Sequence, residues 1–444
     1  MTKAQATGHW AERDRKVVQH VSGNRANKER FVLVKGKGST VWDEHGRAFL
    51  DAHAGAWLAQ VGHGRRELAQ VAAQQMEQLA HFTTAAYFAN PPSIELAEKL
   101  ISRAPRNIGK VRFMSSGSEA DDEALQLVRL FHQRRGEPQR KKILVHRGAF
   151  HGRTYGGLEL MGIHQGNGDA QVIQLTPPWS YHSEWFNQQS ATDFCLQELD
   201  EAIREHGAEN IAALFGELVW GPAGMIPAPD DYWPKVAALL KKHGILFVVD
   251  EVVTAFGRAG AWFTANDYQL TPDVIVLAKG IASGYMPIAA LLLSESFAET
   301  IEGAGGGGSF AGHLVACAVA SANIDIIENE QLVQASRTRG EQLLSALAPL
   351  NDLGIVGNIR GRGLMIGLEL VADKATKVSL FRHYPELLAE IPRYAREEEG
   401  VILSIHGGAL SLTPPLVITA DEVDRLVHTV ENTLKHATAW IGRQ

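Results

Sequence analysis

The chain has 444 residues, of which 45% are hydrophobic and 21% charged, with a formal net charge of −7. This length allows a large core and two or three domains. The acidic balance gives no basic surface for nucleic acid, and no stretch approaches the roughly 18 apolar residues of a membrane helix. The polar, charged segment Met1 to Lys16 lacks the apolar region of a secretory signal. We expect a cytoplasmic globular protein that binds neither nucleic acid nor membrane.

The two cysteines, Cys195 and Cys317, allow at most one disulfide. In a cytoplasmic chain, two buried and inert thiols are the better interpretation.

The first part of the chain alternates short helices and strands. The pattern predicts a helix over residues 8–22, strands near 31–34 and 41–43, a turn over 43–46, and helices over 67–79 and 93–102.

The middle of the chain carries short apolar runs without alternation, interleaved with helical patterns. The runs are 111–114, 143–146, 211–215, 246–249, 274–278 and 289–293, and the helices are predicted over 119–133 and 232–242. Such runs are typical of strands buried on both faces of a mostly parallel sheet. We therefore predict an α/β fold whose large domain holds a mostly parallel sheet between helices.

The pattern changes after residue 311. Helices are predicted over 311–328, 331–348, 385–399 and 421–437, and strands near 355–359, 363–370 and 409–412. This indicates a smaller α+β domain built from both chain ends. The expected organisation is an N-terminal segment packing with the small domain (1–60), a large domain (61–310) and a small C-terminal domain (311–444).

Two charged residues follow apolar runs of the predicted sheet. Asp250 ends one run and Lys279 ends another. Ligands of open α/β sheets bind beyond the carboxyl ends of the strands, so an acid and an amine in one crevice suit several chemistries. The alternative is that both charges simply face water.

A small-residue segment, Ser115 to Ala120, follows a predicted strand and opens a helix. Its free N–H groups and the helix dipole could bind a phosphate. Ordinary N-capping by Ser116 or Ser118 is the alternative interpretation. Phe150, at another strand end, could stack on a planar ring or could belong to the core.

Several familiar motifs are absent from the sequence. There is no GxGxxG after a strand, no P-loop, no HExxH, no cysteine pair spaced for zinc and no GxSxG elbow. We expect no metal site.

Taken together, these residues resemble the class III (ω-) aminotransferases of PLP (pyridoxal 5'-phosphate) fold type I, over about residues 32–423. The resemblance rests on the order and spacing of several segments, each unspecific alone. They are Val41–Arg47 with Leu50-Asp51, Ser116–Ala120, Phe150–Thr154, Val249–Val252 with Phe256–Arg258, Pro272-Asp273, Ala278–Gly280, Gly312-His313 and Pro414–Leu416.

The resemblance implies that Lys279 holds PLP as a Schiff base and then moves the proton between the substrate Cα and the cofactor. It implies that Asp250 keeps the pyridine nitrogen protonated, so that the ring accepts electrons.

The remaining cofactor contacts are implied in the same way. Gly117 and Ser118 would hold the phosphate, and Phe150 and Val252 would cover the two ring faces. His151 and Glu217 would lie near the cofactor.

The family is dimeric, with each site completed by the partner subunit, and further pairing to a tetramer is open. The hydroxyl that the partner gives to the phosphate falls on Ser309 in this sequence. The glycines at 305–308 would then be the loop that delivers it.

The sequence departs from the family where many relatives carry an arginine for a substrate carboxylate. The two usual positions are Ser404 and Ser411 here, and His406 is a nearby candidate substitute. Trp57 falls at a position of the substrate pocket, as Tyr87 or Phe88 could also do. Trp57 could instead be simple core.

These observations predict a transaminase that moves an amino group from a primary amine or ω-amino acid to a 2-oxo acid, with pyruvate as the expected acceptor, by a ping-pong route. Taurine–pyruvate and β-alanine–pyruvate enzymes look similar in the N-terminal half. The alternatives are another PLP reaction on this scaffold (aminomutase, epimerase, decarboxylase or phospho-lyase) and a non-catalytic protein that has kept the fold.

Overall fold

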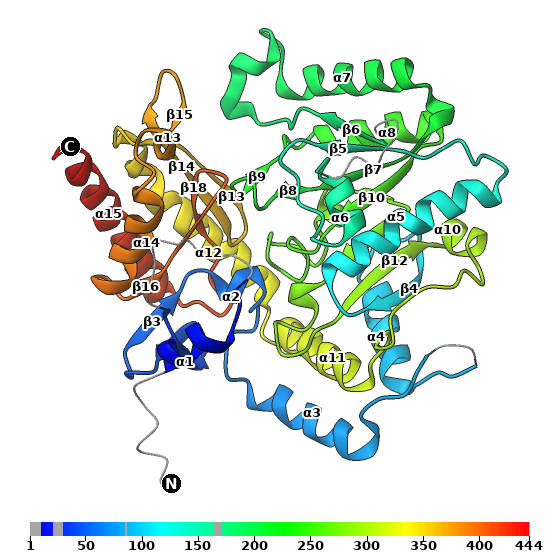
Figure 1. Cartoon of the computed structure of the whole chain (residues 1–444), viewed down its shortest axis with the longest axis horizontal. Helices are drawn as coiled ribbons and strands as arrows, with labels where there is room; N and C mark the ends of the chain where they lie inside the picture. Colours follow the sequence, from blue (N-terminus) through cyan, green and yellow to red (C-terminus); the bar gives the residue numbers. More distant parts are fainter. Residues whose placement is uncertain (1–9, 21–29, 85–86, 164–170, 444) are drawn as a thin grey trace.

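The structure is a computed structural model that describes residues 10–20, 30–84, 87–163 and 171–443. It consists of a larger half and a smaller half that lie side by side, each built around its own sheet (Figure 1). Within the described ranges, no helix is both long and apolar enough to span a bilayer.

The larger half is organised by a seven-stranded sheet with the order β4-β12-β11-β10-β7-β5-β6. Strand β12 runs antiparallel to both neighbours, and the other strand pairs are parallel. The strands are β4 (Ile108–Met114), β5 (Lys142–His146), β6 (Val172–Leu175), β7 (Ile211–Glu217), β10 (Leu246–Asp250), β11 (Val274–Leu277) and β12 (Ala289–Ser294). The predicted mostly parallel sheet is confirmed.

Helices cover both faces of this sheet, which explains why its central strands are apolar throughout. Every residue of β7, β10, β11 and β12 is buried. Val248 packs in the core formed with α5, whereas Phe247 and Val249 pack in the core formed with α7 and α8. The helices of this half are α3 (Arg66–Leu79), α4 (Pro91–Ile101), α5 (Gly117–Arg134), α6 (Tyr155–Leu160), α7 (Ala191–His206), α8 (Tyr232–His243), α9 (Thr264–Asp267) and α10 (Glu295–Thr300).

The smaller half joins the two ends of the chain. Strand β3 (Ala48–Asp51) pairs in parallel with β16 (Val401–Ile402), although some 350 residues separate them in sequence. The other N-terminal elements are α1 (Trp10–Val17), β1 (Leu33–Lys37), β2 (Thr40–Asp43) and the short turn α2 (Ala54–Trp57). The first predicted helix is therefore shorter than 8–22, and residues 8, 9, 21 and 22 lie outside the described ranges.

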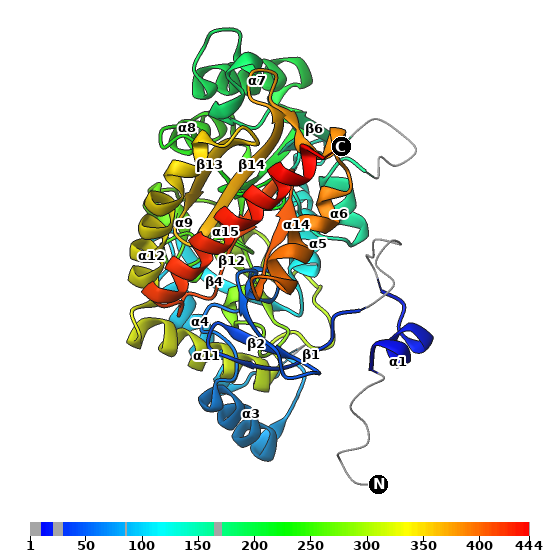
Figure 2. The same cartoon turned by 90° about the vertical axis from the view of Figure 1, so that its left-hand side faces the viewer.

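A five-stranded sheet with helices forms the rest of this half, and α15 crosses in front of it in Figure 2. Its strands are β13 (Val356–Arg362), β14 (Met365–Asp373), β15 (Val378–Ser379), β17 (Ser404–His406) and β18 (Ala409–Leu412). Its helices are α12 (Leu332–Leu347), α13 (Leu380–His383), α14 (Leu387–Glu397) and α15 (Ala420–Ile441), while α11 (Leu314–Asn329) packs against α3 and α4. The two-stranded pair β8 (Val219–Trp220) and β9 (Ile226–Pro227) directly follows β7 in the chain, and β9 packs against β13 of the smaller half.

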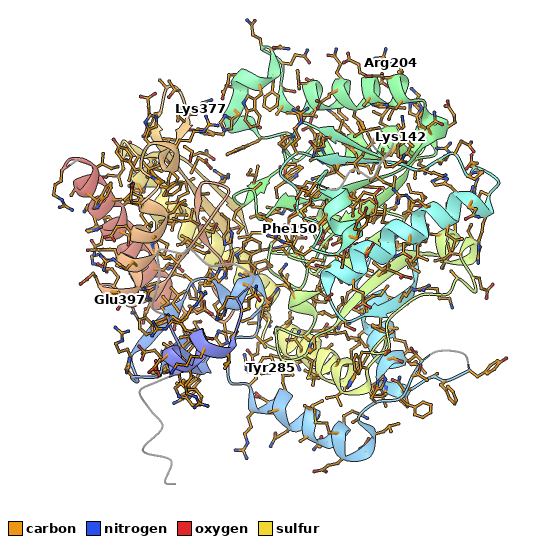
Figure 3. The ribbon with its side chains drawn as sticks, viewed as in Figure 1. Lys142, Phe150, Arg204, Tyr285, Lys377 and Glu397 are labelled. Atoms are coloured by element: carbon orange, nitrogen blue, oxygen red, sulfur yellow. The ribbon has the colours of Figure 1, made fainter. Side chains whose placement is uncertain are left out.

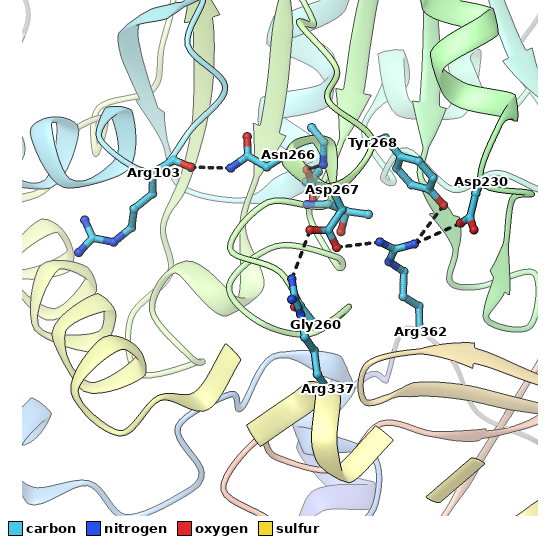
Figure 4. Close-up of polar contacts among 11 residues, drawn as sticks. Arg103, Asp230, Gly260, Asn266, Asp267, Tyr268, Arg337 and Arg362 are labelled. Atoms are coloured by element: carbon cyan, nitrogen blue, oxygen red, sulfur yellow. Dashed lines mark hydrogen bonds and ion pairs between the residues drawn. The ribbon is translucent and has the colours of Figure 1, made fainter. Parts of the chain in front are cut away.

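One carboxylate ties the two halves together (Figure 4). Asp267, at the end of α9, accepts Arg362 Nη2 at 2.7 Å and Arg337 Nη2 at 3.3 Å. Both arginines belong to the smaller half, from β13 and α12. This contact helps to fix the relative position of the halves on either side of the cavity described next.

Candidate active site

A cavity of about 730 Å³ opens where the carboxyl ends of the central strands meet the smaller half. Phe150, on its wall, lies near the middle of the molecule (Figure 3). The residues that line the cavity include Trp57, Ser115, Ser116, Gly117, Ser118, Asp121, Phe150, Arg153, Glu217, Asp250, Val252, Lys279, Met286, Pro287 and His406.

Three ionisable groups reach this cavity from three adjacent strands. Glu217 ends β7, Asp250 ends β10 and Lys279 follows β11 by two residues. Asp250 is paired with Glu217 on one side and with Val276 on the other. Because parallel strands bring their carboxyl ends to one edge, the sheet register itself assembles these groups.

The carboxylate of Asp250 is held in a fixed orientation. It accepts a hydrogen bond from His151 Nδ1 at 2.8 Å and one from the backbone N–H of Val252 at 2.9 Å. Burial lowers the pKa of His151, but the hydrogen bond and charge of Asp250 outweigh it and leave that pKa raised. His151 and the Val252 N–H together fix the orientation of the Asp250 carboxylate.

The Lys279 amine is easier to deprotonate than an exposed lysine. Burial lowers its pKa, while the charges of Asp250 and Glu217 oppose the shift. A lowered pKa gives a larger neutral fraction, which is the nucleophilic form of the amine. The Lys279 backbone has a φ of 45°, in the left-handed region that is costly for a side-chain-bearing residue.

Glu217 anchors the loop that carries Phe150. Its carboxyl accepts the Phe150 N–H at 2.8 Å and the Gly221 N–H at 3.2 Å. Burial, followed by the nearby charge of Asp250, raises the pKa of Glu217 to about 7.

The start of α5 forms the floor of a small-residue cradle. Ser116 caps the helix by accepting the Glu119 N–H. A Cβ on Gly152 would lie 2.7 Å from Ser118 Cα, which excludes a side chain there, and one on Gly117 would be crowded at 3.2 Å from Val252 Cγ1. The first N–H groups of a helix have no partner within it, which leaves this cradle suited to an anion.

The sequence matches the aminotransferase class-III family over residues 21–434. The chain belongs to that family. It is 34% identical to the putrescine–pyruvate aminotransferase of Pseudomonas aeruginosa, over 92% of this chain and 91% of that protein. Its fold superposes on an (S)-enantioselective ω-transaminase of Thermomicrobium roseum with a TM-score of 0.89 and 36% identity, covering 96% and 98% of the two chains. An amine transaminase of an uncultivated Pseudomonas species, in its PLP-bound form, has a TM-score of 0.89 and 35% identity, covering 95% and 98%.

The protein is thus a PLP-dependent aminotransferase of fold type I. The residues around the cavity fit this cofactor: Asp250 can face a protonated ring nitrogen, the start of α5 can take a phosphate, and Lys279 offers an amine. Phe150 and Val252 supply flat and branched apolar surfaces for a ring.

The structure brings most of the predicted site residues together. Those that line the cavity are Trp57, Gly117, Ser118, Phe150, Glu217, Asp250, Val252 and Lys279. His151 lies behind Asp250, fully buried, rather than on the cavity wall.

Three predicted residues are not brought to this cavity. Tyr87 is 100% exposed, Phe88 is half exposed against Phe82, and Ser309 is exposed on its loop. A role for them in a site shared with another subunit stays a prediction.

The sequence interpretation missed Asp121. This residue is buried on the inner face of α5, and its carboxyl, His151 and Asp250 each offer an atom within 4.8 Å of the others. Burial, and then the charges of Asp250 and Glu217, raise the pKa of Asp121 well above its usual value. The available signal was its spacing of four residues from Gly117, which returns it to the same helix face.

Proposed function

We propose that this aminotransferase moves the amino group of a primary amine or ω-amino acid to a 2-oxo acid, pyruvate, by a ping-pong route. The observation that carries the proposal is the meeting of Lys279, Asp250 and Glu217 in one cavity, at the ends of three adjacent strands. The name of the Pseudomonas aeruginosa relative supports pyruvate as the acceptor.

Lys279 and Asp250 take the central roles in this proposal. When bound, PLP supplies a ring that accepts electrons from the substrate. The Nζ of Lys279 would hold the cofactor covalently, and as a free amine it would accept the proton from the substrate Cα. Asp250, oriented by His151, holds a proton on the ring nitrogen, because an unpaired buried charge there is costly.

The remaining residues position the cofactor. The N–H groups around Gly117 and Ser118 take the phosphate, and Phe150 and Val252 enclose the ring. Glu217 keeps Phe150 in place through the backbone hydrogen bond of that loop. These assignments rest on where the side chains lie and on the chemistry that each can supply.

The substrate end of the cavity favours a donor with an apolar chain. Trp57, Met286 and Pro287 supply apolar surface there. The Ser404 hydroxyl is hydrogen-bonded to His53 Nδ1 at 3.0 Å, and Ser411 is fully buried. Neither serine position offers the bidentate guanidinium that best binds a carboxylate.

A second copy of the chain would complete the site in this proposal. Exposed aromatic side chains lie near the Ser309 loop: Phe82, Tyr87, Phe88 and Phe310. Covering them in a homodimer would remove apolar surface from water and would carry Ser309 to the partner's phosphate position. The dimer, a tetramer built from it and the cytoplasmic location remain predictions.

The visible spectrum of the purified holoprotein tests the proposed reaction. We expect the yellow colour to bleach with a primary amine, β-alanine or taurine and to return with pyruvate, with alanine as the product. Conversion of the amino compound without any 2-oxo acid would instead favour a lyase, mutase, epimerase or decarboxylase.

A further inference from the structure

Two residues that line the cavity each carry a ring nitrogen with no hydrogen-bond partner among the described residues. The nitrogens are Trp57 Nε1 and His406 Nε2, both of which are buried. Both side chains line the same cavity, and their rings meet edge to face with centroids 4.7 Å apart. A buried N–H without an acceptor destabilises the protein, because it has lost its hydrogen bonds to water without replacing them. The pair is therefore suited to a ligand that supplies acceptor atoms.

The backbone at Trp57 is strained. Ala54, Gly55, Ala56 and Trp57 have consecutive φ values of 46°, 56°, 81° and 69°. For residues other than glycine, this left-handed conformation is unfavourable because the Cβ comes too close to the following carbonyl oxygen. Such strain persists where the surroundings require it, commonly at functional sites. Here it sets the direction of the Trp57 side chain, which is buried beside the cavity.

His406 is held equally firmly, by the turn between β17 and β18. A Cβ on Gly407 would lie 2.1 Å from the carbonyl oxygen of Ala223, so the turn is pressed against that loop. The His406 ring also stacks on His53, with centroids 5.8 Å apart, and His53 is itself fixed by Ser404. The position of the imidazole is thus set before any substrate arrives.

The pair is electrically neutral. Burial, followed by the nearby His53, lowers the pKa of His406 to about 4. A neutral imidazole can still donate through Nε2, and an indole N–H can only donate. Among the described residues that line the cavity, the lysine and arginine side chains are Lys279 and Arg153. Arg153 is exposed and lies over the Phe150 ring, 5.7 Å from its centroid.

Building on the function proposed above, we propose that Trp57 Nε1 and His406 Nε2 bind the carboxylate of the 2-oxo acid acceptor as two neutral N–H donors, in place of a guanidinium. Two neutral donors lack the opposite charge and the bidentate geometry that a guanidinium offers to a carboxylate. The enzyme should therefore discriminate only modestly between an acceptor that has a carboxylate and one that lacks it.

The test compares two acceptors in the second half-reaction. Holoenzyme is first converted to its amino form with a neutral amine, and stopped-flow absorbance then follows its reaction with pyruvate or with propanal, which lacks the carboxylate. We expect Trp57→Phe and His406→Phe each to lower the pyruvate-to-propanal ratio of kcat/KM about tenfold, the effect of losing one hydrogen bond of about 1.4 kcal/mol. Trp185→Phe, at an exposed tryptophan, is the matched control and should leave the ratio unchanged.

A binding measurement tests the carboxylate site independently of the proposed reaction. Calorimetry with propionate, an unreactive carboxylate, should show about tenfold weaker binding to the Trp57→Phe and His406→Phe holoenzymes. His406→Gln should bind propionate more tightly than His406→Phe, because its amide N–H can replace the lost donor. This arm remains decisive even if no donor bleaches the protein, in which case only the proposed reaction fails. Unchanged ratios and unchanged propionate affinity in folded variants would overturn the proposal. A loss that follows Arg153→Gln instead would overturn it as well.

Discussion

Glu251, next to Asp250, is the buried carboxyl whose removal should damage the scaffold of the site most clearly. Its side chain is fully buried and ties the end of β10 to α9. Oε1 accepts the Ala265 N–H at 2.8 Å, and Oε2 accepts the Thr264 N–H at 2.8 Å and the Thr254 hydroxyl at 2.7 Å.

The change Glu251→Gln keeps the shape of the side chain but replaces one acceptor oxygen with an NH₂ group. If the amide oxygen takes the place of Oε2, the Ala265 N–H loses its acceptor; in the other orientation the Thr264 N–H loses its acceptor and the Thr254 hydroxyl must turn to accept from the amide. Each buried group left without a partner costs about 1–3 kcal/mol. We expect the variant to be destabilised by about 3 kcal/mol.

Urea denaturation followed by tryptophan fluorescence measures this loss. Thr254→Val removes a single donor and should cost about 1 kcal/mol, whereas Glu205→Gln, at an exposed carboxyl on α7, should change little. A Glu251→Gln protein as stable as the Glu205→Gln control would refute the view that this carboxyl holds the end of β10.

Three further changes test other parts of the structure. Asp121→Asn should stabilise the cofactor-free protein more at pH 8 than at pH 5. A carboxyl whose pKa is raised in the folded state lowers the stability of the protein as the pH rises above the pKa of the unfolded state. Equal stabilisation at both pH values in denaturant titrations would contradict this. His146→Gln should reduce the loss of stability between about pH 6.5 and 3. Burial lowers the pKa of His146 to about 3, so up to about 5 kcal/mol of the free energy of unfolding is lost as the pH falls through this range. His45→Gln, at an exposed histidine, should keep the wild-type dependence of stability on pH. Asp267→Asn should cost about 1 kcal/mol in thermal unfolding, with the difference shrinking at high salt because the ion pairs are partly exposed, and a salt-independent loss would argue against this origin.

The central sheet could be predicted because its strands are buried on both faces. The run Leu246 to Asp250 has no polar interruption before its final residue, and such a strand is readable from sequence alone. The class III fold and the free, buried state of both cysteines were also predicted correctly.

Other elements were missed for identifiable reasons. Strand β6 is short, lies at the edge of the sheet and is only half buried, so its pattern is weak. Helix α7 buries Ala191, Cys195, Leu199 and Ile203, spaced by four residues, but further apolar residues (Phe194, Leu196 and Ala202) lie between them and blur the periodicity. Strand β3 forms a local antiparallel pair with β2, but its second partner, β16, is a contact that no local pattern reveals.

The site residues also divide into those whose position the sequence could predict and those whose position it could not. Lys279 and Asp250 could be predicted because each follows an apolar run, and strand ends share an edge of the sheet. The unpaired nitrogens of Trp57 and His406 could not, because their meeting depends on packing between segments that lie far apart in the chain. Sequence periodicity reports which face a residue occupies, and it carries no information on such contacts.

The most direct test of the proposed site is to locate the covalent bond between protein and cofactor. The purified holoprotein is reduced with sodium borohydride and digested, and the peptide carrying the PLP-derived mass is sequenced by mass spectrometry. We predict that the label lies on Lys279 alone and that Lys279→Ala protein carries none. A label on a different lysine, or a Lys279→Ala protein that is labelled as the wild type is, would contradict the assignment of this cavity as the active site.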